Sequence, residues 1–201
     1  AANSLGANKA LIIDTTVPTI SSVALASNNS TIAVTFGEAV YNTSAGSGSL
    51  ETSDFALSIS GGTATLANNS ATPTSISASG NVYTLGIGLS GTPDGSEVLT
   101  VVPIDDGVYD GAGNEASTTQ SNNTVTLNDQ TAPTVSSVTA TTADGSYKVG
   151  DVIAITVTFS ETVIVTTTAG TPQLTLETGS SDAIVDYASS SGATLTFNYT
   201  V

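Results

Sequence analysis

The chain has 201 residues and 39% hydrophobic residues, which is enough for one large or two ordinary domains. Its charge is strongly acidic: 17 acidic residues and two lysines give a net charge of −15. This balance excludes the electrostatic footprint of nucleic-acid binding, because almost nothing could neutralise phosphate, and it disfavours binding to anionic membranes for the same reason. The chain has no Cys, so disulfides are excluded, and no apolar run of about 18 residues predicts a membrane-spanning helix.

The sequence offers few of the residue types that catalysis usually needs. The chain has neither His nor Cys, so the usual general base, the thiol nucleophile and the soft ligands of zinc are all missing. We therefore expect a protein that is not an enzyme.

The hydrophobic pattern predicts an all-β fold. Apolar residues alternate over short runs that are bounded by Gly, Asn, Ser and Pro, and no stretch sustains a helical period. Aromatic residues make up only 5%, so Val, Ile, Leu and Ala must form the cores. The predicted strands are 9–13, 20–26, 31–36, 55–59, 63–67, 74–79, 82–89, 97–102, 123–127, 135–140, 153–159, 174–176, 183–187 and 194–201.

One stretch occurs twice and divides the chain. Asp14-Thr15-Thr16-Val17-Pro18 returns as Asp129-Gln130-Thr131-Ala132-Pro133, and a strand pattern follows each copy. Further along, Phe36 and Glu38 match Phe159 and Glu161, which places an inserted loop at 144–151. We predict tandem β-sandwich domains with the boundaries 1–13 (final strand of a preceding repeat), 14–128 (first repeat) and 129–201 (second repeat, incomplete).

The two ends of the chain fit together as parts of a repeating array. Residues 1–13 contain one strand and precede a joint, whereas residues 129–201 lack a counterpart of the loop at 104–114 and of a final strand. We expect the chain to be a piece of a longer array. The alternative is that residues 1–13 of one subunit complete the second domain of another by strand exchange.

The order of the motifs resembles a known family. The joint at Asp14, the strand ending Thr35-Phe36-Gly37-Glu38 and the later Asp110-Gly111-Ala112-Gly113-Asn114 are similar to the bacterial Ig-like repeats of large cell-surface adhesins. Tyr147-Lys148-Val149-Gly150-Asp151 and Pro172-Gln173-Leu174-Thr175-Leu176 resemble a second type of the same repeat. The resemblance implies secreted, extracellular, Greek-key sandwich domains in tandem, often stiffened by calcium and without catalytic activity.

Acidic residues are expected to meet at one end of the first repeat. In a Greek-key sandwich the entering linker, the loop after the second strand and the loop before the last strand lie at the same pole. These segments hold Asp14, Glu38 and the loop 105–114. Calcium prefers such oxygen ligands, and the carboxylates would repel one another without a cation. The predicted calcium ligands are Asp14, Glu38, Asp105, Asp106, Asp110 and Asn114, with Asp129 and Glu161 beginning an equivalent second site.

These observations predict a structural spacer in an adhesin stalk or filament, with neighbouring repeats or identical subunits as partners. One alternative is a module that binds a glycan or another surface ligand through the loops 43–53 and 104–115, where Tyr41, Tyr83 and Tyr109 are the aromatic candidates. The other is the strand-exchanging filament subunit described above.

Overall fold

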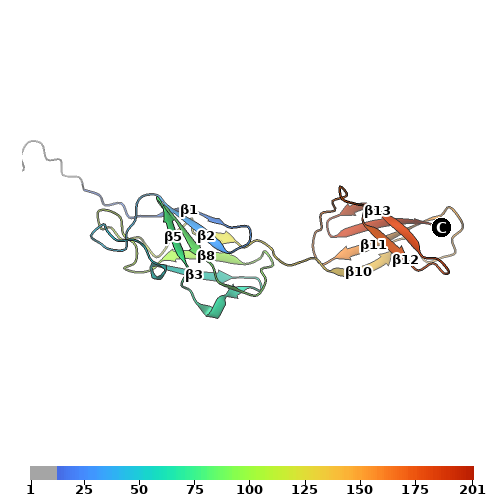
Figure 1. Cartoon of the computed structure of the whole chain (residues 1–201), viewed down its shortest axis with the longest axis horizontal. Helices are drawn as coiled ribbons and strands as arrows, with labels where there is room; N and C mark the ends of the chain where they lie inside the picture. The colour runs from blue at the N-terminus through green and yellow to red at the C-terminus, as the bar shows by residue number, and fades with distance from the viewer. Residues whose placement is uncertain (1–12) are drawn as a thin grey trace, which may run out of the picture. The chain divides into compact units, whose positions relative to one another are not determined.

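The computed structural model describes residues 13–201, and they form two compact units that divide between Thr131 and Ala132. Both units consist of antiparallel β-strands, as the all-β prediction requires (Figure 1). The strand predicted at 9–13 lies outside the described residues except for Ile13. No helix among residues 13–201 is long and apolar enough to cross a membrane.

The first unit contains nine strands and two short 3₁₀ turns among its described residues. The elements are β1 (Ile20–Leu25), β2 (Thr31–Phe36), η1 (Thr52–Asp54), β3 (Phe55–Ser60), β4 (Thr65–Leu66), η2 (Ala67–Asn69), β5 (Ile76–Ser79), β6 (Val82–Gly86), β7 (Leu89–Ser90), β8 (Val98–Pro103) and β9 (Thr124–Thr126). They form one sheet in the order β1-β2-β6-β5, a second in the order β3-β8-β9, and the pair β4-β7.

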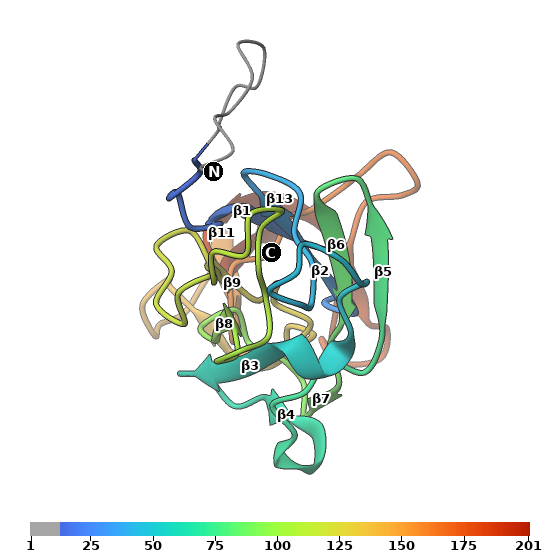
Figure 2. The same cartoon turned by 90° about the vertical axis from the view of Figure 1, so that its left-hand side faces the viewer.

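The core of the first unit lies between its two larger sheets, which Figure 2 shows on opposite sides of the unit. Strand β2 alternates as predicted: Ile32, Val34 and Phe36 are at most 2% exposed, whereas the residues between them are half-buried. Phe36 contacts the rings of Phe55 and Tyr83, one from each sheet, at centroid distances of 6.3 and 5.9 Å. This aromatic group joins the two layers near the end of β2.

The second unit is one five-stranded arrangement. Its strands are β10 (Val135–Ala140), β11 (Val152–Phe159), β12 (Gln173–Leu176), β13 (Ala183–Ser191) and β14 (Thr194–Thr200), in the order β10-β11-β14-β13-β12. Four hydrophobic residues are fully buried there, against sixteen in the core of the first unit. The buried four are Val157, Val185, Leu195 and Phe197. The second unit therefore rests on a much smaller core.

Both units begin with the same irregular strand pair. The register of β1 on β2 shifts between Ile20 and Ser22, and the register of β10 on β11 shifts between Val135 and Ser137. The repeated sequence thus produces a repeated β-bulge, which adds local twist to the edge strand.

Most predicted strands are present, and the exceptions have local causes. The strand predicted at 63–67 is reduced to β4. It ends early because Asn68 and Asn69 adopt left-handed φ values of 56° and 53° in η2. It starts late, and the N–H groups of Thr63 and Ala64 donate to the Glu97 carboxylate. The strand predicted at 82–89 is split into β6 and β7 around Ile87. The other strands start or end within a few residues of their expected bounds.

The boundary between the units lies three residues beyond the predicted one. Asn128, Gln130 and Thr131 all hydrogen-bond to the first unit: the Asn128 N–H donates to Asn29, and the Gln130 N–H donates to the Pro93 carbonyl at 2.9 Å. The start of the second linker is therefore part of the first unit.

Candidate metal centre

Three carboxylates from distant parts of the sequence meet at one end of the first unit. One oxygen from each of Asp14, Glu38 and Asp110 lies within 4.8 Å of the other two. Among the described residues this is the one group of three or more acidic side chains placed closely enough to share a metal ion. The convergence expected from sandwich topology is present for these three residues.

Asp14 approaches from the linker that precedes β1. Its Oδ1 accepts the Thr16 N–H at 2.9 Å, so the side chain folds back over its own turn. Its backbone carbonyl accepts a hydrogen bond from the Asn114 side chain at 3.2 Å. This contact attaches the exposed linker to the loop that carries Asp110.

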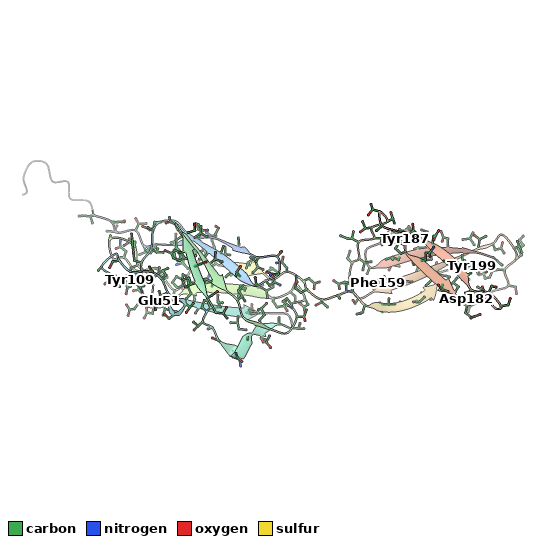
Figure 3. All side chains as sticks on the ribbon, viewed as in Figure 1. Glu51, Tyr109, Phe159, Asp182, Tyr187 and Tyr199 are labelled. Atoms are coloured by element: carbon green, nitrogen blue, oxygen red, sulfur yellow. The ribbon has the colours of Figure 1, made fainter. Side chains whose placement is uncertain are left out.

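Glu38 follows the end of β2 by two residues. The Gly37 N–H donates to the Thr19 carbonyl at 3.0 Å, which holds this turn beside the linker. Tyr41 and Tyr109 then exchange two backbone hydrogen bonds of 2.7 and 2.8 Å, which fix the segment after Glu38 against the segment before Asp110. Figure 3 labels Tyr109 at the end of the first unit where the chain enters from Ile13.

Asp110 is fully buried at the turn of its loop. Its Oδ1 accepts the N–H groups of Ala112 and Asn114, each at 2.8 Å, and its Oδ2 accepts the Asn114 side-chain amide at 2.7 Å. All of these contacts are donated to the carboxylate, so they stabilise its charged form. The loop therefore positions a buried negative charge whose direction is fixed by its own backbone.

The carboxylates differ in their affinity for protons. Burial raises the pKa of Glu38, and the charges of Asp110 and Asp14 raise it further. For Asp110, burial would also raise the pKa, but the hydrogen bonds from Asn114, Ala112 and Gly113 outweigh it and lower the pKa. The charged form of Asp110 is therefore stabilised by its hydrogen bonds, whereas the charged form of Glu38 is destabilised by burial and by the two neighbouring carboxylates.

The geometry fits calcium. Calcium–oxygen bonds of about 2.3–2.6 Å place ligands on opposite sides of the ion about 4.6–5.2 Å apart. Oxygens that all lie within 4.8 Å of one another can therefore touch one such ion. Calcium takes roughly six to eight oxygen ligands. Three carboxylates supply part of this set, and backbone carbonyls and water can complete it. The donors are all hard oxygens, which suit calcium better than a transition metal.

The remaining predicted ligands of this loop have other roles. The Asn114 side-chain amide donates to both Asp14 and Asp110, so this residue positions the cluster. Asp106 accepts the Tyr109 hydroxyl at 2.9 Å, and its N–H donates to Glu115. Asp105 is exposed, and neither it nor Asp106 belongs to the three-residue cluster.

The second predicted site starts from residues in different units. Asp129 belongs to the first unit, and its Oδ1 accepts the Thr131 N–H at 2.7 Å, the same turn that Asp14 makes with Thr16. Glu161 belongs to the second unit and follows the end of β11 by two residues, as Glu38 follows β2. That these two residues share an ion stays a prediction.

Two features of the first unit are not evident from the sequence pattern. The pattern predicts a strand that begins at Glu97, yet Glu97 is fully buried before β8 and accepts N–H groups from Thr63, Ala64, Asp94 and Gly95 at 2.9–3.3 Å. The Asp94-Gly95 turn beside it was the one available signal. Tyr83 is 7% exposed and donates its hydroxyl to the Val40 carbonyl, so it cannot serve as a surface aromatic for a glycan.

Comparisons with known proteins identify no relative. No protein-family model, curated protein or solved structure matches this chain.

Proposed function

We propose that this chain is a structural spacer segment of an extracellular tandem-repeat surface protein, and that calcium stiffens the joint at which its first domain begins. The ion is held by Asp14, Glu38 and Asp110, with Asn114 positioning two of them. No catalytic step is assigned to the chain, and its partners are neighbouring repeats of the same kind.

The strand order of the first unit supports Ig-like Greek-key domains as the building blocks. An Ig constant-type sandwich has four strands in the order A-B-E-D in one sheet and C-F-G in the other. The orders β1-β2-β6-β5 and β3-β8-β9 correspond to these two sheets when β4 and β7 are treated as a side pair. The repeated joint and the repeated β-bulge support a tandem arrangement of such domains.

The observation that carries the calcium proposal is the meeting of three carboxylates at the linker. Asp14 belongs to the linker, whereas Glu38 and Asp110 belong to loops of the domain that follows. An ion that binds all three attaches the linker to the domain and removes the freedom to bend at this point. In its absence the like charges repel, and the charges of Asp110 and Asp14 add to the effect of burial in raising the pKa of Glu38.

The expected size of the effect follows from mass action. A ligand that binds only the folded state at about 100 times its dissociation constant stabilises that state by about 2.7 kcal/mol. For a domain of about 115 residues this raises the melting temperature by roughly 10 °C. The same binding should protect the linker around Val17 from proteases.

The test compares two Asp-to-Asn variants of one loop. Thermal unfolding and calcium titration calorimetry are measured for the wild type, Asp110→Asn and Asp105→Asn, in EDTA and in calcium. We expect calcium to stabilise the wild type and Asp105→Asn alike, and to have little effect on Asp110→Asn. Because Asp105 is exposed and outside the cluster, it controls for the change in net charge.

Two outcomes would contradict the proposal. One is a wild-type melting temperature and a cleavage rate near Val17 that are the same in EDTA and in calcium. The other is an Asp110→Asn variant that keeps the full response to calcium.

A further inference from the structure

Four Asp-Gly pairs occur in the chain, and all of them lie in the part that the structure describes: Asp94-Gly95, Asp106-Gly107, Asp110-Gly111 and Asp144-Gly145. In such a pair the glycine nitrogen can attack the carboxyl group of the preceding aspartate, because glycine has no Cβ that would hinder the approach. The attack requires an N–H group and a carboxyl group that are not held by other partners. Hydrogen bonding in the folded chain therefore determines which pairs react.

In the Asp94-Gly95 pair both reacting groups are held. The Gly95 N–H donates to the buried carboxylate of Glu97 at 3.2 Å. Asp94 Oδ1 accepts the Ser96 N–H at 3.0 Å, in the turn that an aspartate commonly makes with the backbone two residues further on. Both contacts would have to break before the nitrogen could reach the carboxyl carbon.

The Asp106-Gly107 pair is held in the same two ways. The Gly107 N–H donates to the Ile104 carbonyl at 3.2 Å. The Asp106 carboxylate accepts the Tyr109 hydroxyl at 2.9 Å. This pair too can react only after its loop has opened locally.

The Asp110-Gly111 pair is held through its carboxylate. Asp110 is fully buried, and its two oxygens accept the N–H groups of Ala112 and Asn114 and the Asn114 side-chain amide. These donors fix the direction of the carboxyl group, so its carbon cannot turn toward the Gly111 nitrogen in the folded state.

The Asp144-Gly145 pair has none of these contacts. Both residues are exposed in the loop between β10 and β11, and no hydrogen bond joins either of them to another residue within 13–201. The turn is closed instead by Tyr147, whose hydroxyl donates to the Ala143 carbonyl. This contact brackets the pair and leaves its nitrogen and its carboxyl free. The pair thus differs from the other three in its own local hydrogen bonding.

We propose that Asp144-Gly145 is a modification site, at which the folded chain converts aspartate to isoaspartate. The Gly145 nitrogen attacks Asp144 Cγ and forms a C–N bond, and the amide hydrogen leaves with the carboxyl hydroxyl as one water molecule. The five-membered succinimide that results takes up one water molecule at either carbonyl. Cleavage of the Cγ–N bond restores aspartate, whereas cleavage of the original peptide bond leaves the main chain running through Cγ. The mass is unchanged, and water is the one co-reactant.

The product lengthens the main chain by one methylene group within the loop. Because no strand hydrogen bond reaches this position, β10 and β11 should keep their pairing. Asp144 does not belong to the cluster of Asp14, Glu38 and Asp110, so this inference does not depend on the proposed function.

The first experiment ages the full chain at neutral pH and physiological temperature, folded in EDTA and unfolded in concentrated urea. Digestion after glutamate followed by electron-transfer fragmentation distinguishes isoaspartate from aspartate at each pair. In the folded chain we expect isoaspartate to form at Asp144 at least about tenfold faster than at the other three pairs, because those must first open locally. In urea we expect the four rates to become similar.

The second experiment compares Gly145→Ala with Ser146→Ala, a change at the next exposed residue that keeps the Asp-Gly pair intact. Gly145→Ala should slow the conversion at Asp144 by about tenfold, because a Cβ hinders the approach of the nitrogen. Ser146→Ala should age like the wild type. Circular dichroism checks that both variants keep their strands.

Three results would overturn this inference. The first is a folded chain in which Asp144 converts no faster than the other three pairs. The second is a preference for Asp144 that persists unchanged in urea, since neighbouring sequence rather than hydrogen bonding would then cause it. The third is a Gly145→Ala variant that ages as fast as the wild type.

Discussion

At the scale of single residues, buried carboxylates organise the first unit. Asp110 and Glu97 are both fully buried, and backbone N–H groups surround each of them. For Glu97, burial would raise the pKa, but the hydrogen bonds from Ala64, Thr63 and Asp94 lower it. Both residues therefore keep their charge at neutral pH. Glu97 joins two loops within the domain, whereas Asp110 faces the linker, so the candidate for metal binding is Asp110.

The raised pKa of Glu38 predicts how stability depends on pH. A carboxyl whose folded pKa is raised favours the protonated folded state, so its ionisation costs stability as the pH rises. In EDTA, the first unit should become more stable as the pH falls from neutral towards the ordinary pKa range of a glutamate, because Glu38 takes up a proton in the folded state first. Further acidification should destabilise it, because Asp110 and Glu97 have lowered pKa values and lose their hydrogen-bonded charge below their ordinary range. Thermal melts across this range measure the profile.

Calcium and a substitution of Glu38 test whether Glu38 causes this pH dependence. Because calcium and the proton compete for Glu38, the stabilisation by calcium should shrink over the same interval. Glu38→Gln should reduce the gain in stability between neutral and mildly acidic pH, and part of the gain should remain because burial also raises the pKa of Asp54 in the same unit. Asp105→Asn, a change at an exposed residue outside the cluster, should leave the gain in place. A Glu38→Gln profile that matches the wild type would show that another group causes the pH dependence.

At the scale of elements, two loops must lie in close contact to hold the cluster. Gly113 has a φ of +89°, and a Cβ there would clash with the Ser44 carbonyl oxygen. Since backbone rather than a flexible side chain occupies this space, only glycine allows the loop of Asp110 to lie against the loop of Ser44.

This contact predicts a difference between two glycine substitutions. Gly80 also has a positive φ, of +58°, but a Cβ there would meet nothing within 4 Å. Gly80→Ala should cost roughly 1 kcal/mol of backbone strain, whereas Gly113→Ala should cost roughly 2–3 kcal/mol and also weaken calcium binding. Chemical denaturation gives the free energies, and calorimetry gives the affinity. Equal effects of the two variants on both quantities would mean that the packing of the loops does not support the site.

At the scale of the whole molecule, the two units have cores of very different size. Sixteen buried hydrophobic residues support the first unit and four support the second, so the second should unfold at a lower temperature. Calorimetry of the full chain should resolve two transitions. Calcium should raise only the upper one, because all three residues of the cluster belong to the first unit. A single transition that does not respond to calcium would contradict this division.

Much of the architecture was predictable because strand patterns are local. The alternation at Ile32, Val34 and Phe36 predicts a half-buried strand without knowledge of its neighbours. The repeat is likewise visible as sequence similarity between the two joints. The meeting of Asp14, Glu38 and Asp110 could also be anticipated, since the end at which each loop lies follows from the order of strands in a sandwich.

The sequence by itself determined the all-β class, most of the strands and the end of the domain where acidic residues gather. Only the tertiary structure decided which of those residues meet: Asp110 turns inward because its loop supplies N–H donors, whereas Asp106 pairs with Tyr109 instead. It also decided that Glu97 is buried and that Val138 is not. The physical reason is that burial and side-chain direction depend on what the rest of the chain places against a residue, which a local pattern does not contain.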